Sequence, residues 1–248
     1  MIELIGLKKA FGSKVVTSDL SLTVNTGEFL AIIGRSGEGK SVLLKQIIGL
    51  IESDGGEIII NGLQVSKLKG LEKQKIFKEC GYVFQFAALL DSLSVFENIA
   101  LYHLEQGIKP EDVLPLVVEK VKSVGLTPDV LEKFPDELSG GMKKRVGLAR
   151  TLMMTPKILI YDEPTTGLDP VTTRLIHELM KETHIKFNTT TIVISHDVEI
   201  FKYATHVAML HEGKIIYKGD AASIWECDNP YIYQFIRGLA EGPINHGT

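Results

Sequence analysis

The sequence predicts an α/β fold with a mainly parallel sheet that is covered by helices on both faces. Three observations lead to this prediction. Strand patterns and helix patterns alternate along much of the chain. The segment KILIY at 157–161 shows little polar alternation, which is typical of a strand buried on both sides. The length of 248 residues also suits one continuous α/β core.

The elements follow in order from the local patterns. The first residues predict strands at 2–7 and 15–24, where SDLSLTV alternates polar and apolar residues. Gly27 marks a turn before a short buried strand at 28–34, and residues 41–50 have helical spacing. Two further strands are expected at 57–61 and 81–84.

Residues 87–137 change in character. Helix-like stretches at 95–104, 111–123 and 129–134 are separated by glycines and prolines. This pattern indicates a helical subdomain inserted into the α/β core. After this region, strand patterns and helix patterns alternate again. They lie at 157–161, 171–183, 190–195, 198–203, 206–211 and 214–218. We therefore expect one domain over 1–248, with 87–137 as its insertion and 230–248 as a C-terminal tail.

Composition and charge exclude several classes of protein. The net charge of −4 argues against a general nucleic-acid binder, which usually carries a basic excess. Cys80 and Cys227 lie far apart and form no C-x-x-C unit, so a reduced, cytoplasmic setting is expected. No signal segment is found at the start, and no apolar run approaches the roughly 20 residues that span a bilayer. Any membrane role is therefore expected to be that of a peripheral subunit.

The segment GRSGEGKS at 34–41 matches the phosphate-loop pattern G-x-x-x-x-G-K-[ST]. A strand precedes it and a helix follows it, as the motif requires. Its glycines allow backbone N–H groups to surround a phosphate, and the helix N-terminus adds a favourable dipole. Lys40 would neutralise the β- and γ-phosphates of ATP, and the Ser41 hydroxyl would bind Mg²⁺. The alternative is a glycine-rich turn before a helix.

Polar side chains follow three other expected strands. ILIYDE at 158–163 ends in two acids, of which Asp162 would hold Mg²⁺ and Glu163 would polarise the attacking water. Gln85 ends GYVFQ, where its amide would reach Mg²⁺ or that water, and His196 follows TIVIS, where its imidazole would contact the γ-phosphate. Taken singly, the acids could be a solvated loop, and Gln85 and His196 could be structural.

With LSGGM at 138–142 the set of motifs is complete, and the sequence resembles the nucleotide-binding domain of ABC transporters over essentially its whole length. GLDP at 167–170 and SHD at 195–197 stand in the family's order. The resemblance implies a phosphate-loop NTPase core with N-terminal antiparallel β elements and an inserted helical subdomain. It also implies ATP hydrolysis with Mg²⁺ by a homodimer.

The resemblance assigns roles to individual residues. Glu163, His196 and Gln85 are implied as catalytic, and Ser41, Gln85 and Asp162 as metal-binding. Phe11 matches the aromatic residue that stacks on adenine. Ser139 would cap the γ-phosphate held by the other protomer, and Asp169 would cross the dimer interface. The full set of implied nucleotide-binding residues is Phe11, Gly34, Ser36, Gly37, Gly39, Lys40, Ser41, Val42, Ser139, Gly140, Gly141 and Asp169.

Two positions depart from the family pattern. The segment LSGGM at 138–142 corresponds to the signature motif of the family, which usually ends in Gln where this chain has Met142. Val42 stands where Thr or Ser would donate a hydroxyl to the α-phosphate. Together with GKSVLLK and QFIRGLAEGP at 234–243, they give the chain a resemblance to the Mla/Mce-associated ATPases of bacterial phospholipid transport. In that group the tail usually runs longer and packs on the partner ATPase. Here it stops at Thr248, so tail exchange is left open.

The narrower resemblance implies particular partners and a location. The partners are an integral-membrane permease (MlaE-like), an MCE-domain lipid-binding protein and a small STAS-domain subunit, without nucleic acid. The location is the cytoplasmic face of the inner membrane. Three other functions stay open: the ATPase of a small-solute importer, a soluble assembly-type ABC ATPase, and a regulatory nucleotide-binding module without turnover.

The stretch FAALLDSLSVFENIAL at 86–101 is unusually apolar for a segment after the expected catalytic Gln85. Two interpretations have equal weight for Phe86, Leu89 and Leu90. In the first, they belong to the core of the helical insertion. In the second, they line a groove for a permease helix, since helix-in-groove contacts use apolar anchors.

Overall fold

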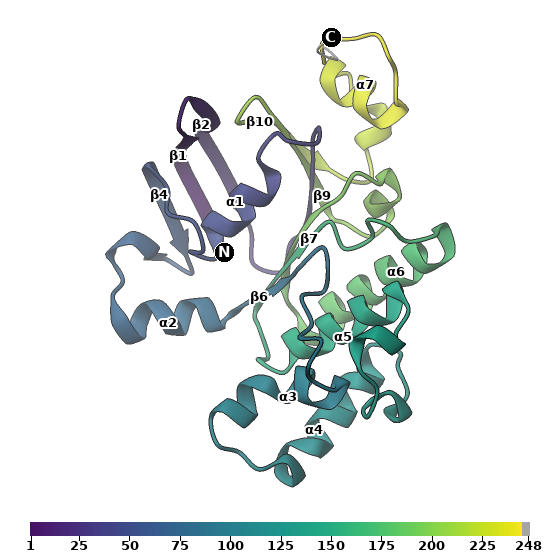
Figure 1. Cartoon of the computed structure of the whole chain (residues 1–248). Coiled ribbons are helices and arrows are strands. Elements are labelled where there is room, and N and C mark those ends of the chain that lie inside the picture. The colour runs from purple at the N-terminus through teal and green to yellow at the C-terminus, as the bar shows by residue number, and fades with distance from the viewer. Residues whose placement is uncertain (245–248) are drawn as a thin grey trace. The chain divides into compact units, whose positions relative to one another are not determined.

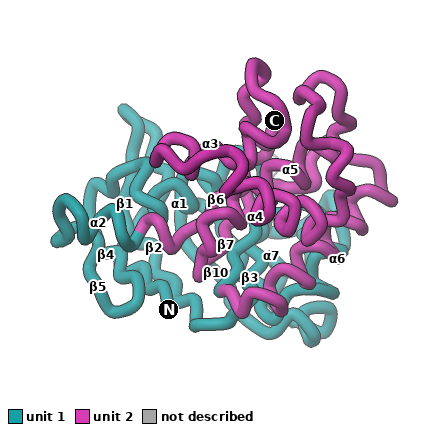
Figure 2. Tube along the Cα trace, turned by 90° about the horizontal axis from the view of Figure 1, so that it is seen from below, with its two compact units in different colours: residues 1–76, 190–248 teal, residues 77–189 magenta. Residues whose placement is uncertain are grey.

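The structure is a computed structural model that describes residues 1–244. The chain divides into two compact units, which Figure 2 colours separately. Unit 1 comprises Met1–Ile76 and Thr190–Thr248, and unit 2 comprises Phe77–Thr189. The helices expected in 87–137 lie in unit 2. This unit also contains the strands and helices on either side of that range, so it is larger than the expected insertion. The boundaries of that insertion remain a proposal.

The first sheet of unit 1 is antiparallel throughout (Figure 1). Its strand order is β2-β1-β4-β5. The strands are β1 (Ile2–Phe11), β2 (Lys14–Val24), β4 (Gly55–Ile60) and β5 (Leu63–Gln64). This confirms the N-terminal antiparallel β elements that the sequence predicts.

The second group of strands in unit 1 is largely parallel. β3 (Phe29–Ile33) pairs in parallel with β8 (Thr190–Ile194) and with β9 (His206–His211), while β10 (Lys214–Asp220) pairs antiparallel with β9. Every residue of β3 and β8 is buried, as expected of strands covered on both faces. The mainly parallel α/β class is therefore confirmed.

The helical segments of unit 1 are short. They are α1 (Lys40–Ile47), η1 (Val65–Lys67), η4 (Val198–Lys202), η5 (Ile224–Glu226) and α7 (Pro230–Arg237), and α2 (Gly70–Lys78) begins there. Helix α2 is absent from the sequence-based prediction. Ile76 is its one buried residue, so the helix carries no apolar stripe that a pattern could reveal.

Unit 2 combines a parallel strand pair with longer helices. β6 (Cys80–Val83) pairs in parallel with β7 (Ile158–Asp162), whose five residues are all buried. The helical segments are α3 (Val95–Glu105), α4 (Pro110–Ser123), η2 (Pro128–Val130), η3 (Pro135–Glu137), α5 (Gly140–Leu152) and α6 (Pro170–Phe187).

The expected helix-like stretch at 129–134 is wrong beyond its first turn. Only η2 (Pro128–Val130) is helical there, and it is a 3-10 turn. The reason is Pro135, because the residue before a proline is driven into the extended region. Phe134 has φ −98° and ψ 161°, as this rule requires.

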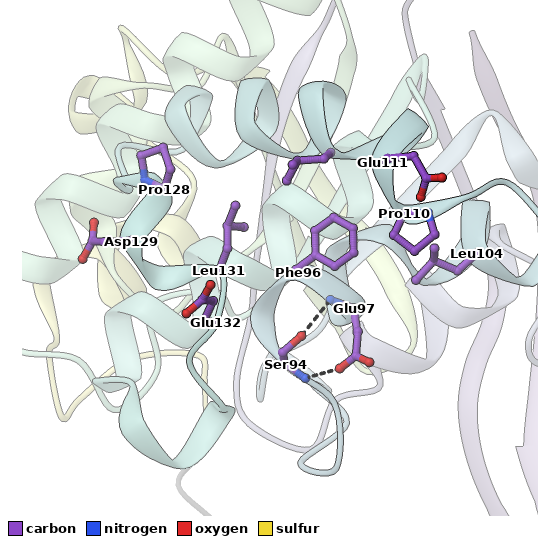
Figure 3. A pocket seen from close by; sticks show the side chains of 11 residues that line it. Ser94, Phe96, Glu97, Leu104, Pro110, Glu111, Pro128, Asp129, Leu131 and Glu132 are labelled. Carbon is purple, nitrogen blue, oxygen red and sulfur yellow. Dashed lines mark hydrogen bonds between the residues drawn. The ribbon is translucent and has the colours of Figure 1, made fainter.

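The start of α3 is fixed by side chains. The Ser94 hydroxyl accepts a hydrogen bond from the N–H of Glu97, whose carboxylate accepts one from the N–H of Ser94 (Figure 3). The buried amide of Asn98 accepts from the N–H of Leu90 and donates to the carbonyl oxygens of Leu90, Leu93 and Ser94. The apolar loop before α3 is therefore held from inside the helix.

The C-terminal segment folds back on its own helix. The buried Gln234 of α7 donates to the carbonyl oxygens of Leu239 and Ile244 and accepts from the N–H of Ile244 at 2.7 Å. The expected tail at 230–248 thus packs within the same chain as far as residue 244. Its last four residues lie outside the described part of the chain.

Candidate functional site

The phosphate loop joins β3 to α1 in unit 1, as predicted. Lys40, the first residue of α1, is only 4% exposed. Its ammonium group donates to the carbonyl oxygens of Gly34 and Arg35, at 2.8 Å each. These bonds hold the positive charge against the loop rather than in solvent. Ser36 and Gly37 at the centre of the loop are exposed.

Gly39 is required at the junction of loop and helix. Its φ is +90°, which L side chains rarely adopt, and a Cβ there would lie 2.2 Å from Cγ1 of Val16. Ser41 and Val42 follow in the first turn of α1, and both are half-buried. Val42 therefore presents methyl groups where a hydroxyl is the family pattern.

The loop carries an acidic residue, Glu38, that sequence reasoning leaves without a role. Its carboxylate lies 2.9 Å from Nδ1 of His211 and accepts a hydrogen bond from the N–H of Glu212. The His211 ring packs on Tyr231 of α7, with centroids 5.1 Å apart. These partners hold the negative charge of Glu38 at β9. The sequence separation of 173 residues gives no local signal for this contact.

His196 lies at the same strand edge as the phosphate loop. Ile32 of β3 pairs with Ile194 of β8 in parallel register, so the loop and His196 both leave the carboxyl ends of neighbouring strands. His196 is exposed. Phe11 ends β1 with half of its surface exposed, and the Lys9 ammonium lies 5.3 Å from its ring centroid. An aromatic face is thus accessible in unit 1.

The two acids and Gln85 are brought together in unit 2. Val83 of β6 pairs with Tyr161 of β7, which places the next residues of both strands at one edge. The Gln85 amide nitrogen donates to Oε2 of Glu163 at 3.1 Å. Two residues expected to share one reaction are therefore in contact, which neither strand pattern alone would establish.

Asp162 has a partner that the sequence analysis does not include. The Tyr82 hydroxyl donates to Oδ2 of Asp162 at 2.7 Å. Burial, and then the neighbouring carboxylate, raise the pKa of Tyr82 well above its usual value, so this hydroxyl remains a donor. Tyr82 thus fixes the orientation of the expected metal-binding carboxylate.

Glu163 has backbone φ +49°, in the left-handed region that few non-glycine residues adopt. Its Oε2 also accepts a hydrogen bond from the Thr166 hydroxyl at 3.1 Å. Lys144 of α5 donates to the carbonyl oxygen of Thr166 at 2.8 Å. Burial lowers the pKa of Lys144, and the nearby Glu163 carboxylate opposes that shift.

The segment after Gln85 is held by α5. Ala87 and Ala88 have φ values of +52° and +47°, and the guanidinium of Arg150 donates to both of their carbonyl oxygens, at 2.8 Å and 2.7 Å. A Cβ added at Gly147 would lie 3.2 Å from the Ala87 oxygen. This face of α5 therefore sets the path of the chain.

The signature residues begin α5. Ser139 caps the helix by accepting a hydrogen bond from the N–H of Met142, and Ser139 and Gly140 are exposed. A Cβ at Gly141 would lie 2.6 Å from Cγ2 of Thr172, so α6 requires glycine there. A Cβ at Gly140 would make only an ordinary contact, 3.6 Å from Leu168. The packing of this chain does not require glycine at that exposed position.

Asp169 caps α6. Its carboxylate accepts hydrogen bonds from the N–H groups of Val171 and Thr172 and from the Thr172 hydroxyl. The hydroxyl and backbone bonds of Thr172 lower the pKa of Asp169. Asp169 therefore has a local structural role, and its expected contact with a second protomer remains a proposal.

The expected magnesium ligands are all oxygen donors. A serine hydroxyl, a glutamine amide oxygen and an aspartate carboxylate suit a hard cation such as Mg²⁺. Ser41 lies in unit 1, whereas Gln85 and Asp162 lie in unit 2. Asp162 ends β7, Gln85 follows β6 and Ser41 lies in the first turn of α1, and by chemistry this donor set fits the ion.

The three apolar residues expected either in the core or at a docking groove are not core residues as a group. Phe86 is 83% exposed, Leu90 is 46% exposed and Leu89 is half-buried. The core interpretation is therefore wrong for Phe86 and Leu90. Both side chains are exposed, and their docking to a permease helix stays a proposal.

A separate groove lies among α3, α4 and η2 (Figure 3). It has a volume of about 1020 Å³, and none of the three residues above lines it. Its lining includes the apolar side chains of Phe96, Leu104 and Leu131 and the acids Glu97, Glu111, Asp129 and Glu132. Within residues 1–244, no helix combines the length and the apolar content needed to cross a membrane.

Comparisons with known proteins agree on one family. The sequence model described as "ABC transporter" matches residues 17–166. The chain is 37% identical over 245 residues to the "Probable ribonucleotide transport ATP-binding protein mkl" of Mycobacterium tuberculosis, covering 98% of this chain and 68% of that protein. It is 35% identical over 246 residues to the "Intermembrane phospholipid transport system ATP-binding protein MlaF" of Haemophilus influenzae, covering 98% and 93%.

Two further similarities bear on function. The chain is 38% identical over 226 residues to the "Methionine import ATP-binding protein MetN" of Rhizobium johnstonii, covering 91% of this chain and 62% of that protein. Its fold superimposes, with a TM-score of 0.80 and 28% identity, on the "Dimeric structure of a post-hydrolysis state of the ATP-binding cassette MJ0796 bound to ADP and Pi". That match covers 89% of this chain and 99% of the other.

Proposed function

The chain belongs to the ABC transporter family and is an ATP-hydrolysing subunit of a transporter, and we propose that its permease moves phospholipid between bacterial membranes. One observation supports this cargo. MlaF, whose name specifies intermembrane phospholipid transport, is 35% identical to this chain over 98% of the chain and 93% of its own length.

In the proposed mechanism, the phosphate loop of unit 1 binds ATP. The ammonium of Lys40 and the N–H groups of the loop offset the charge of the β- and γ-phosphates. Phe11 stacks on adenine, and His196 contacts the γ-phosphate. Ser41, Asp162 and Gln85 would hold Mg²⁺, which would supply charge neutralisation of the phosphates.

The groups of unit 2 would prepare the water. Glu163 accepts a proton from the water that attacks the γ-phosphate, and Gln85 and Thr166 hold the carboxylate through their hydrogen bonds to Oε2. Tyr82 keeps Asp162 oriented. Proton transfer to Glu163 and the position of its carboxylate are thus the contributions of this chain to hydrolysis.

ATP-binding cassettes of this family work as dimers, and we assign Ser139 a contact with the γ-phosphate bound by the other copy. Ser139 and Gly140 present an exposed helix N-terminus, where N–H groups and the helix dipole favour an anion. Among residues 1–244, a Cβ at Gly140 would meet only an ordinary contact with Leu168, which supports close approach by another molecule.

Mixing two inactive variants tests this arrangement. A heterodimer of Ser139→Arg and Lys40→Ala protomers contains one site with an intact loop and an intact signature. Phosphate release by the mixture is expected to exceed that of either parent, because both lesions fall in the other site. If the mixture is no more active than its parents although heterodimers form, trans action is unsupported.

Charge placed on the exposed apolar segment should uncouple the chain from its permease. Phe86→Asp with Leu90→Asp is expected to abolish co-purification with the permease, because a carboxylate in an apolar contact costs several kcal/mol unless it is paired. ATPase activity of the isolated subunit should persist, since neither side chain is in the phosphate loop. Thermal unfolding would show that the fold survives.

A matched variant is Leu71→Asp, which changes an apolar residue of α2 that is 82% exposed. It should leave co-purification unchanged. Equal loss with Leu71→Asp would mean that any surface charge disrupts the complex. Retained co-purification with the Phe86 and Leu90 changes would place the permease elsewhere.

The cargo is tested with the transporter in nanodiscs. We expect the ATPase rate of the purified complex to respond to phospholipid and not to methionine or ribonucleotides. The proposal also places the chain on the cytoplasmic face of the inner membrane, with an MlaE-like permease, an MCE-domain protein and a STAS-domain subunit. Stimulation by lipid with these partners in the purified complex would support all of these assignments.

A second candidate is the ATPase of a small-solute importer, which the similarity to MetN favours. Stimulation by a polar solute with its binding protein, and none by lipid, would establish it. A soluble assembly-type ATPase would co-purify with no membrane protein. A regulatory module would release no phosphate.

A further inference from the structure

We propose that Lys144 is a positioning residue for Glu163, acting from the signature helix α5 through the turn that carries the carboxylate. The inference rests on the proposed role of Glu163 as the base. It adds a residue that belongs to none of the motifs described above, and it connects the helix that starts at Ser139 to the base of the same chain.

The contacts form a continuous path. Lys144 donates from its ammonium group to the carbonyl oxygen of Thr166 at 2.8 Å. The N–H of Thr166 donates to the carbonyl oxygen of Glu163 at 3.3 Å, which closes a tight turn. The Thr166 hydroxyl donates to the Glu163 carboxylate at 3.1 Å. Lys144 therefore anchors the residue that holds Glu163 by both backbone and side chain.

The turn needs such an anchor. Glu163 has φ +49°, and a non-glycine residue keeps this unfavourable conformation only where its surroundings determine it. A charge-assisted bond to the far end of the turn restricts the backbone that would otherwise relax. Without it, we expect the Glu163 carboxylate to sample orientations away from its hydrogen bonds to Gln85 and Thr166.

The lysine itself is well placed for this role. Lys144 lines a small space together with Val83, Leu148, Tyr161 and Pro164, so its path from α5 is restricted by packing. Half-burial lowers the pKa of the ammonium, while the Glu163 carboxylate favours its charged form. Packing and the hydrogen bond to Thr166 thus restrict the Lys144 side chain more than is usual for a surface lysine.

Lys144 and Ser139 also share one helix. They are five positions apart, which is about 7.5 Å along the axis at 1.5 Å per residue. A displacement of the start of α5 by a second protomer would therefore be carried to Thr166 and Glu163. In this arrangement, the contact that completes the neighbouring site also adjusts the base of this one.

Steady-state ATPase kinetics of the full chain test the proposal. Lys144→Met keeps the length of the stem and removes the charge and the donor. We expect kcat to fall about 10-fold, because a 1 Å misplacement of a catalytic group can cost about 100-fold and a smaller displacement costs less. KM for ATP should stay within about twofold, since no assigned nucleotide contact changes. Lys144→Arg, which keeps a cationic donor, should restore most of kcat.

The neighbouring lysine gives a matched control. In the described residues, the Lys143 side chain makes no hydrogen bond or ion pair, so Lys143→Met should leave kcat unchanged. A double-variant cycle with Thr166→Val tests the path itself. If Lys144 acts through the turn, Lys144→Met with Thr166→Val should be much less impaired than the product of the two single effects.

Several outcomes would overturn the proposal. These are a normal kcat in Lys144→Met, an equal loss in Lys143→Met, a change in KM alone, or independent effects of Lys144 and Thr166. Glu163→Gln separates this failure from failure of the proposed function. If that variant is inactive while Lys144→Met is normal, only the positioning role is wrong. If Glu163→Gln is fully active, the assignment of the base is wrong as well.

Discussion

Lys40→Ala is expected to reduce phosphate release to background, a loss of at least about 100-fold. The phosphate loop directs the Lys40 ammonium at its own carbonyl oxygens, where it lies 2.8 Å from those of Gly34 and Arg35. Together with the N–H groups of the loop, it offsets the charge of the phosphates. The measurement is phosphate release at saturating ATP and Mg²⁺.

Lys45→Ala is the matched control, because it removes a lysine from the last turn of the same helix. It should turn over ATP normally. Thermal unfolding of Lys40→Ala should resemble that of the unchanged protein, which would exclude loss of the fold as the cause. Near-normal phosphate release by Lys40→Ala would show that the loop has been assigned wrongly.

Glu163→Gln is expected to bind ATP and to hydrolyse it at least about 100-fold more slowly. The amide keeps the shape of the side chain but cannot accept the proton from water. ATP should then remain bound at the composite sites, each of which combines the phosphate loop of one copy with the signature of the other. The bound ATP should hold the two copies together. Light scattering with and without ATP measures the dimer, and phosphate release measures the chemistry.

Glu182→Gln changes an exposed glutamate on α6 and should behave as the unchanged protein. A Glu163→Gln protein that binds nucleotide but stays monomeric would contradict the composite-site arrangement. Rapid hydrolysis by this variant would instead assign the base to another residue. Light scattering therefore tests the dimer and phosphate release tests the base, each independently of the other.

Most of the candidate site could be predicted because it consists of short motifs at strand ends. The phosphate loop depends on glycines and a lysine that are neighbours in sequence, and the strand FLAII before it is recognisable by composition alone. Asp162 and Glu163 follow an apolar strand in the same way. Parallel pairing then brings Gln85 to Glu163, as sheet geometry requires.

The rest could not be predicted because it depends on contacts between distant parts of the chain. Tyr82 and Asp162 are 80 residues apart, and Arg150 reaches Ala87 across 63. A tyrosine in a strand or an arginine in a helix has no local pattern that specifies such a partner. Helix α2 could not be predicted for a local reason, because it buries too little apolar surface to show a helical stripe.

The clamp of Arg150 on Ala87 and Ala88 has a mechanical consequence. A segment held at two successive carbonyl oxygens, with Gly147 directly beneath it, has little room to bend and moves only together with α5. It is therefore a stiff arm rather than a hinge. Gln85 and Phe86 directly precede this clamped segment, so the two side chains share one anchor on α5, whereas a glycine-rich loop in place of Ala87 and Ala88 would bend more freely.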